Sequence, residues 1–171
     1  MSERTTPAED PIVTEHIRGS VNAFYSAFAR ADAGAMVQLY HPEVRFTDPV
    51  FGELDREHVG AMWHMLCERG SRTGLQVEHG PPQVIGDRAI VEWKARYRFG
   101  AKGRAVHNRI QAEMIFKDGA IIRHTDHFDT YRWAGQAFGP MGHLLGWTGF
   151  FRDRLRKRTR ALLEAYMRKS D

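Results

Sequence analysis

An imidazole and a carboxylate lie two residues apart in residues 121–131. If this segment is a β-strand, His124 and Asp126 share one face with Ile122 and Phe128, because side chains alternate with a period of two. An acid/base pair between apolar neighbours is what a buried proton-transfer site needs. At about 7 Å between Cβ atoms, the pair favours a shared substrate or water over a direct hydrogen bond. A polar pair that satisfies itself inside a core fits equally well.

Asp48 is a third candidate for acid/base chemistry. It follows Val44 and Phe46 on the apolar face of a short predicted strand that ends at Pro49. Partial desolvation there would raise the pKa of Asp48 and make it a better base near neutrality. The alternative is structural, because an Asp before a proline commonly caps a loop at the end of a strand.

Aromatic and amide side chains are predicted to face the same concavity as these ionisable groups. They are Trp63, Trp93, Tyr97, Asn108 and Phe128. Aromatic walls with a few polar groups suit a planar or polycyclic ligand. Each of these aromatic residues alone also fits an ordinary core position. The amide of Asn108 either bonds to the backbone or orients a ligand carbonyl.

Metal and cofactor sites are not expected. His124 and His127 point to opposite faces of their predicted strand, and His58 and His64 lack the helical spacing of a metal pair. Cys67, the single cysteine, lies in an apolar helical run, where a core thiol is favoured over a nucleophile. Phosphate-loop and dinucleotide fingerprints are absent from the sequence.

The elements that must position these residues begin with helices. A helix is predicted from residue 11 to a break at residues 32–34. Its apolar stripe consists of Val13, Ile17, Val21, Phe24 and Phe28. A short helix over residues 35–40 should stop at a His-Pro pair. A short strand over residues 44–48 and a third helix over residues 54–69 follow.

From residue 75 on, the apolar residues no longer follow the helical period and recur at every second position. Strand pieces are predicted at residues 75–78 and 84–85, and long half-buried strands at residues 89–99 and 106–116. Asp118-Gly119 predicts a hairpin turn into the final strand. Helices first and antiparallel strands later predict an α+β fold, with the helices packed on one face of a curved sheet.

Two motifs carry a family resemblance. With the order of elements, residues 40–52 (YHPEVRFTDPVFG) and 118–129 (DGAIIRHTDHFD) resemble the nuclear transport factor 2-like superfamily over roughly residues 12–133. Members include SnoaL-type polyketide cyclases, ketosteroid isomerases and limonene epoxide hydrolases. The resemblance implies a cone-shaped antiparallel sheet with the N-terminal helices in its concave face. It also implies a homodimer through the outer sheet face, which should carry Ile115, Ile121 and Tyr131.

The catalytic residues of these relatives transfer only in part. Asp48 matches the Asp-Pro general base of ketosteroid isomerases, but Ala112 falls near the position of their oxyanion-hole acid. Asp126 resembles the last-strand Asp of limonene epoxide hydrolases, but Trp93 falls where their Arg would be. The resemblance therefore best supports a SnoaL-like acid/base site built from His124 and Asp126.

The C-terminal part of the chain extends beyond this resemblance. Residues 138–151 are apolar, rich in glycine and too short to span a bilayer. Residues 152–171 hold 8 Lys and Arg against 3 Asp and Glu, while the remainder is nearly neutral, so a nucleic-acid partner is not expected. The basic helix should bury a stripe of Phe151, Leu155, Leu162 and Tyr166. A lid over the mouth of the cone or a dimer arm is preferred, and contact with a membrane surface is the less favoured alternative.

Three segments are therefore expected: a disordered N-terminus (residues 1–11), a SnoaL-like cone domain (residues 12–134) and the extension (residues 135–171). The leading hypothesis is a small cofactor-free cytoplasmic enzyme that performs isomerisation, cyclisation or hydration on an apolar carbonyl or epoxide. The competing hypothesis is a non-catalytic module that binds a hydrophobic small molecule or a protein.

Overall fold

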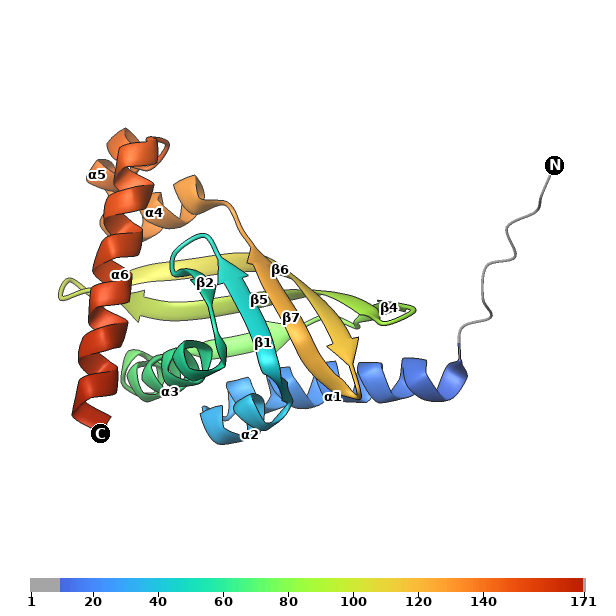
Figure 1. Cartoon of the computed structure of the whole chain (residues 1–171). Coiled ribbons are helices and arrows are strands. Elements are labelled where there is room, and N and C mark those ends of the chain that lie inside the picture. Colours follow the sequence, from blue (N-terminus) through green and yellow to red (C-terminus); the bar gives the residue numbers. More distant parts are fainter. Residues whose placement is uncertain (1–9, 171) are drawn as a thin grey trace.

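The computed structural model of the chain describes residues 10–170 (Figure 1), so most of the N-terminus expected to be disordered lies outside the described residues. The helices are α1 (Pro11–Ala29), α2 (Ala33–Gln38), α3 (Arg56–Thr73), α4 (Thr130–Phe138), α5 (Pro140–Leu145) and α6 (Gly149–Ser170). The strands are β1 (Tyr40–Asp48), β2 (Gly52–Leu54), β3 (Gln76–His79), β4 (Gln83–Ile85), β5 (Arg88–Phe99), β6 (Arg104–Lys117) and β7 (Ala120–His127).

The strands form one curved sheet in the order β2-β1-β7-β6-β5-β3, with β4 also paired to β5. Figure 1 shows α1, α2 and α3 on one side of the sheet, while α6 runs across its open end from the α4–α5 pair towards α3. The predicted α+β class is confirmed. All pairs are antiparallel except β1 with β7, which run parallel.

Two local expectations differ from the structure. The sheet includes β2, a strand of three residues that is too short to show a period of its own. The strand β1 already begins at Tyr40 and runs through Pro42, which was expected to mark a break. The register of β1 against β7 shifts between Tyr40 and Arg45, and a proline is tolerated at such an irregularity because no regular ladder bond is required there.

A bulge in β7 reverses the expected faces near its start. Register shifts between Ile115 and Phe116, so that Ile121 pairs with Phe116 and Ile122 is passed over. As a result Ile121 is fully buried and Ile122 is only half-buried. The predictions that Ile122 shares the face of His124 and that Ile121 lies on the outer dimer face are therefore wrong. Tyr131, which was also expected on the outer sheet face, lies in α4 instead. The dimer itself remains a prediction.

The helices α4 and α5 pack back to back through glycines. A Cβ atom at Gly142 would overlap the backbone carbonyl of Ala134, and one at Gly135 would overlap the ring of His143. The two short helices therefore approach each other closely. Because larger residues would separate them, these glycines give the pair a defined shape.

The last helix docks onto the turn between β1 and β2. Thr159 Oγ1 donates to the carbonyl of Val50 at 2.8 Å, and Arg156 Nε and Arg160 Nε donate to the carbonyls of Pro49 and Phe51. Part of the basic stretch is thus used for docking. The apolar stripe also differs from the prediction, because residue 163 is the buried leucine while residue 162 is exposed. In the described part of the chain, no helix is long and apolar enough to cross a membrane.

Candidate functional site

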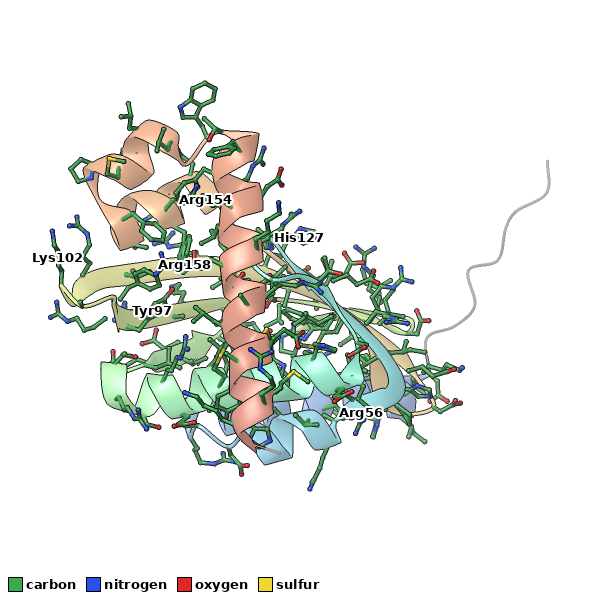
Figure 2. All side chains as sticks on the ribbon, turned by 60° about the vertical axis from the view of Figure 1, so that its left-hand side comes forward. Arg56, Tyr97, Lys102, His127, Arg154 and Arg158 are labelled. Atoms are coloured by element: carbon green, nitrogen blue, oxygen red, sulfur yellow. The ribbon has the colours of Figure 1, made fainter. Side chains whose placement is uncertain are left out.

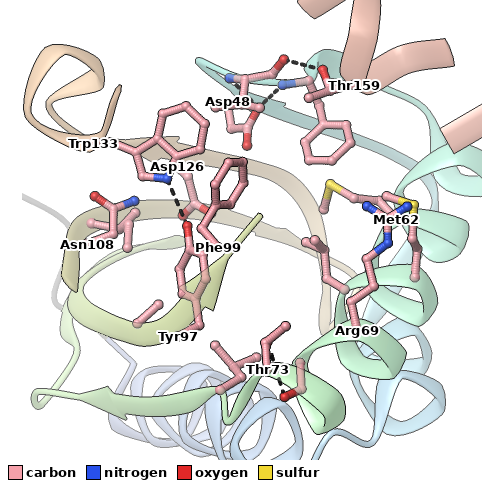
Figure 3. Close-up of a pocket in the computed structure, with 18 of the residues that line it drawn as sticks. Asp48, Met62, Arg69, Thr73, Tyr97, Phe99, Asn108, Asp126, Trp133 and Thr159 are labelled. Atoms are coloured by element: carbon pink, nitrogen blue, oxygen red, sulfur yellow. Dashed lines mark hydrogen bonds between the residues drawn. The ribbon is translucent and has the colours of Figure 1, made fainter. Parts of the chain in front are cut away.

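A cavity of about 450 Å³ opens between α3, the concave face of the sheet and the helices α4 and α6 (Figure 3). Its size is within the range of small-molecule sites. Seven of the eight residues predicted for the site line it: Asp48, Trp63, Trp93, Tyr97, Asn108, Asp126 and Phe128. The eighth, His124, is not among the lining residues and lies behind Asp126.

Beneath the cavity, a chain of buried hydrogen bonds ends at Asp126. Trp63 Nε1 donates to Tyr40 Oη at 3.0 Å, and Tyr40 Oη lies 2.8 Å from His124 Nδ1. His124 Nε2 lies 3.2 Å from Asp126 Oδ1, which also accepts from Trp93 Nε1 at 3.3 Å. An indole N–H can only donate, so the Tyr40 oxygen accepts from Trp63 and its own proton is directed to Nδ1. His124 then carries its proton on Nε2 and donates a hydrogen bond to Asp126.

The surroundings of His124 explain why it supports the site rather than entering it. Its ring is fully buried and packs edge-on against Phe24 and Phe46, with centroid distances of 5.4 and 5.1 Å. The direct bond to Asp126 corrects the expectation that a shared ligand or water would separate the pair. The two side chains lean towards each other along the strand, which brings their polar atoms closer than the Cβ separation indicates.

Asp126 is the polar group at the floor of the cavity. Only 5% of it is exposed, and both of its hydrogen bonds end on Oδ1. Among the described residues, no hydrogen bond reaches Oδ2. One oxygen is therefore fixed by donors, and the other is available to a ligand in the cavity.

Asp48 lies at the other side of the cavity, as the last residue of β1. Its Oδ1 accepts from the backbone N–H groups of Val50 at 2.9 Å and Phe51 at 2.5 Å. Burial raises the pKa of Asp48 to about 7; the Phe51 N–H opposes that rise, and the charge of Asp126 adds to it. Asp48 thus caps a turn and faces the cavity at once, so the two alternatives weighed from the sequence are compatible.

Two further polar groups face the cavity from β5 and β6. Tyr97 Oη accepts a hydrogen bond from Trp133 Nε1 at 2.8 Å (Figure 3), which leaves the phenol proton for a ligand oxygen. Burial raises the pKa of Tyr97, so the phenol stays protonated. The side-chain amide of Asn108 makes no hydrogen bond within the described part of the chain. Both groups are therefore free to bind a carbonyl or hydroxyl.

Sequence reasoning missed several residues of the site. Tyr40 is part of the first motif and had no predicted role, yet it links Trp63 to His124. The cavity wall also includes Trp133 of α4 and Leu155, Arg158 and Thr159 of α6. The extension was expected to form a lid or a dimer arm, but no periodicity in the sequence indicates which of its residues reach the cavity. Among the described residues, no group of three or more His, Cys, Asp or Glu side chains is arranged to hold a metal ion.

A sequence profile of the SnoaL-like domain matches residues 21–124, which is more than half of the chain. The chain therefore belongs to the SnoaL-like domain family. Its fold is nuclear transport factor 2-like, as the resemblance implied. No curated protein matches the chain in sequence.

Solved structures of the same fold match at low identity. TerC, co-crystallised with polyporic acid, is 19% identical with a TM-score of 0.60 over 72% of this chain and 98% of its own. An epoxide hydrolase from M. tuberculosis, similar to limonene epoxide hydrolase, is 16% identical with a TM-score of 0.61 over 77% and 96%. A protein from Xanthomonas campestris pv. campestris, described as a polyketide cyclase, is 20% identical with a TM-score of 0.58 over 73% and 98%. At these identities the similarity concerns the fold alone.

Proposed function

We propose that this protein is a cofactor-free acid/base enzyme that acts on an apolar, planar carbonyl or epoxide compound. The observation that carries the proposal is the placement of two carboxyl groups, Asp48 and Asp126, in one aromatic cavity. Their environments differ: the N–H groups at Asp126 come from the side chains of Trp93 and His124, whereas those at Asp48 come from the backbone of its turn, and burial raises the pKa of Asp48 to about 7. Paired carboxyl groups in different environments are suited to divide acid and base roles.

Asp126 acts as the base in this proposal. Its free Oδ2 removes a proton from carbon next to the substrate carbonyl, while its other oxygen stays bound to Trp93 and His124. Asp48, protonated below about pH 7, donates its proton to the substrate oxygen. The enol therefore forms without a full negative charge on that oxygen. His124 and Tyr40 are positioning residues, because they reach the substrate only through Asp126.

Binding of the substrate is assigned to the walls of the cavity. The rings of Trp63, Trp93 and Phe128 contact its faces, and Tyr97 and Asn108 bond to its polar atoms. The helix α6 serves as a lid: Leu155 and Thr159 line the cavity, and Thr159 binds the turn that Asp48 caps. A non-catalytic ligand-binding role is the second candidate, favoured by the aromatic side chain at Trp93, where epoxide hydrolases place a catalytic Arg.

Exchange of the carbon-bound protons of 2-tetralone in D₂O, followed by NMR, tests the chemistry without knowledge of the natural substrate. We expect the enzyme to accelerate the exchange, and Asp126→Asn to lower the catalysed rate by about 10²–10⁴-fold. Asp87→Asn removes an exposed carboxylate from the β4–β5 turn and is the matched control. Tight binding of the ketone with no accelerated exchange would favour the ligand-binding module.

The pH profile of the exchange tests the assignment of the two carboxyl groups. If Asp48 supplies the proton, the rate falls as pH rises through about 7 and Asp48→Asn abolishes that dependence. A rate that instead rises through about 7 would make Asp48 the base, as the resemblance to ketosteroid isomerases implies.

A further inference from the structure

The region between α5 and the start of α6 carries an exposed apolar patch, here called the C-terminal tip. It consists of Met141, Leu144, Leu145, Trp147 and Phe150. These side chains are between 39% and 74% exposed, and half of the ten exposed large hydrophobic residues of the described chain fall within this stretch of ten residues. None of them lines the cavity. These five residues therefore do not cover the mouth of the cone, and the alternative role of the stretch as a dimer arm stays a prediction.

The tip is held in a defined position. Close packing at Gly142 fixes α5 against α4, and Trp147 Nε1 donates to the carbonyl of Leu144 at 3.1 Å. Figure 1 shows α4, α5 and the first turns of α6 at one end of the molecule, beyond the edge of the sheet. The apolar side chains are thus presented at an extremity, where a flat surface meets them without obstruction from the sheet.

Positive charge adjoins the tip on α6. Arg152, Arg154 and Lys157 are exposed and make no ion pair among the described residues. The sequence has a single acidic residue, Asp153, between Asp129 and Glu164. Figure 2 shows Arg154 and Arg158 along the half of α6 next to the tip. The apolar tip is therefore bordered by exposed cations that attract an anionic surface.

We propose that the C-terminal tip binds the surface of a bilayer that contains anionic lipid. Exposed Trp, Phe and Leu side chains enter the boundary between headgroups and acyl chains, and adjacent arginines and lysines bind lipid phosphates. A second copy of this chain is a poorer occupant. A two-fold pairing of the tip would bring two copies of the same basic stretch together, and like charges repel across a buried interface.

The tip contains a natural reporter. Of the four tryptophans, Trp63, Trp93 and Trp133 are buried, so Trp147 is the one exposed indole. The full-length protein is mixed with vesicles of phosphatidylcholine alone, or of phosphatidylcholine with phosphatidylserine at roughly one lipid in three. Brominated acyl chains then quench any indole that enters the bilayer. We expect at least tenfold stronger co-sedimentation with the anionic vesicles, together with quenching, and loss of most binding at high salt.

Variants separate the tip from other exposed apolar residues. We expect the double variant Trp147→Ser, Phe150→Ser to lose at least ten-fold in vesicle affinity. Ile85→Ser, which changes an exposed residue of β4, should bind like the unchanged protein. Equal binding of the double variant and the unchanged protein would overturn the proposal. So would a concentration-dependent dimer in sedimentation velocity that the double variant abolishes, without binding to either vesicle, because the tip would then be a contact between two copies.

Discussion

Two tryptophans show how differently the cavity floor and the C-terminal tip are built. Trp63 is 2% exposed, donates to Tyr40 and supports the chain of hydrogen bonds that ends at Asp126. Trp147 is 71% exposed and donates to a backbone carbonyl three residues before it. The cavity floor buries the rings of Trp63, Trp93 and His124 and pairs their N–H groups or ring nitrogens with buried acceptors or donors. The tip buries little, although its residue types are equally apolar.

This contrast separates two kinds of constraint on a sequence. At the cavity floor each residue is constrained by its neighbours, because an unpaired polar group in a buried network is costly. At the tip the neighbours constrain only the backbone, and the apolar side chains lower the solubility of an isolated protein. An exposed patch of this kind therefore indicates a partner.

The largest effect is expected when the buried series of hydrogen bonds is interrupted at Tyr40. Tyr40→Phe keeps the ring but leaves Trp63 Nε1 and His124 Nδ1 without their shared partner. Each of the two unsatisfied buried groups costs about 1–3 kcal/mol, so the free energy of unfolding should fall by about 2–6 kcal/mol. Urea unfolding measures this, with Tyr131→Phe at an exposed position as the control. A loss no larger than that of the control would mean that these buried hydrogen bonds contribute little to stability.

An intermediate effect is expected where the tip joins the rest of the molecule. A methyl group at Gly142 overlaps the carbonyl of Ala134, so Gly142→Ala should separate α4 from α5 at a cost of about 1–3 kcal/mol. Gly149→Ala is the matched control, because no atom lies within 4 Å of the added methyl group. Thermal unfolding of both variants distinguishes packing from a general glycine effect. Equal melting temperatures would contradict the close packing of α4 against α5.

The smallest effect is expected at the tip itself. Trp147→Ser should change the free energy of unfolding by no more than about 0.5 kcal/mol, because an exposed side chain loses little burial. The measurement is urea unfolding of the protein without vesicles. A loss above about 1 kcal/mol would break the contrast with the cavity floor, since Trp147 would then be packed in solution.

Much of the fold was predictable, because the buried face of a helix or strand requires apolar residues at a regular spacing in the sequence. The predicted stripe of α1 is buried at Ile17, Val21, Phe24 and Phe28, whereas Val13, its first member, is 46% exposed near the start of the helix. The alternation over residues 89–99 and 106–116 predicts β5 and β6 with their correct inward faces. The pattern fails at Ile121 and Ile122, because a bulge changes the register without any change in composition.

The sequence by itself determined the fold class, the apolar cavity walls and the presence of ionisable residues on an inward face, because periodicity and residue type report burial directly. Tertiary structure alone decided which groups meet. It placed His124 behind Asp126 and added Tyr40 to their chain. It also brought Thr159 from α6 to the turn of Asp48 and left Trp147 in solvent. These outcomes depend on contacts between distant segments, which the local pattern of apolar and polar residues does not indicate.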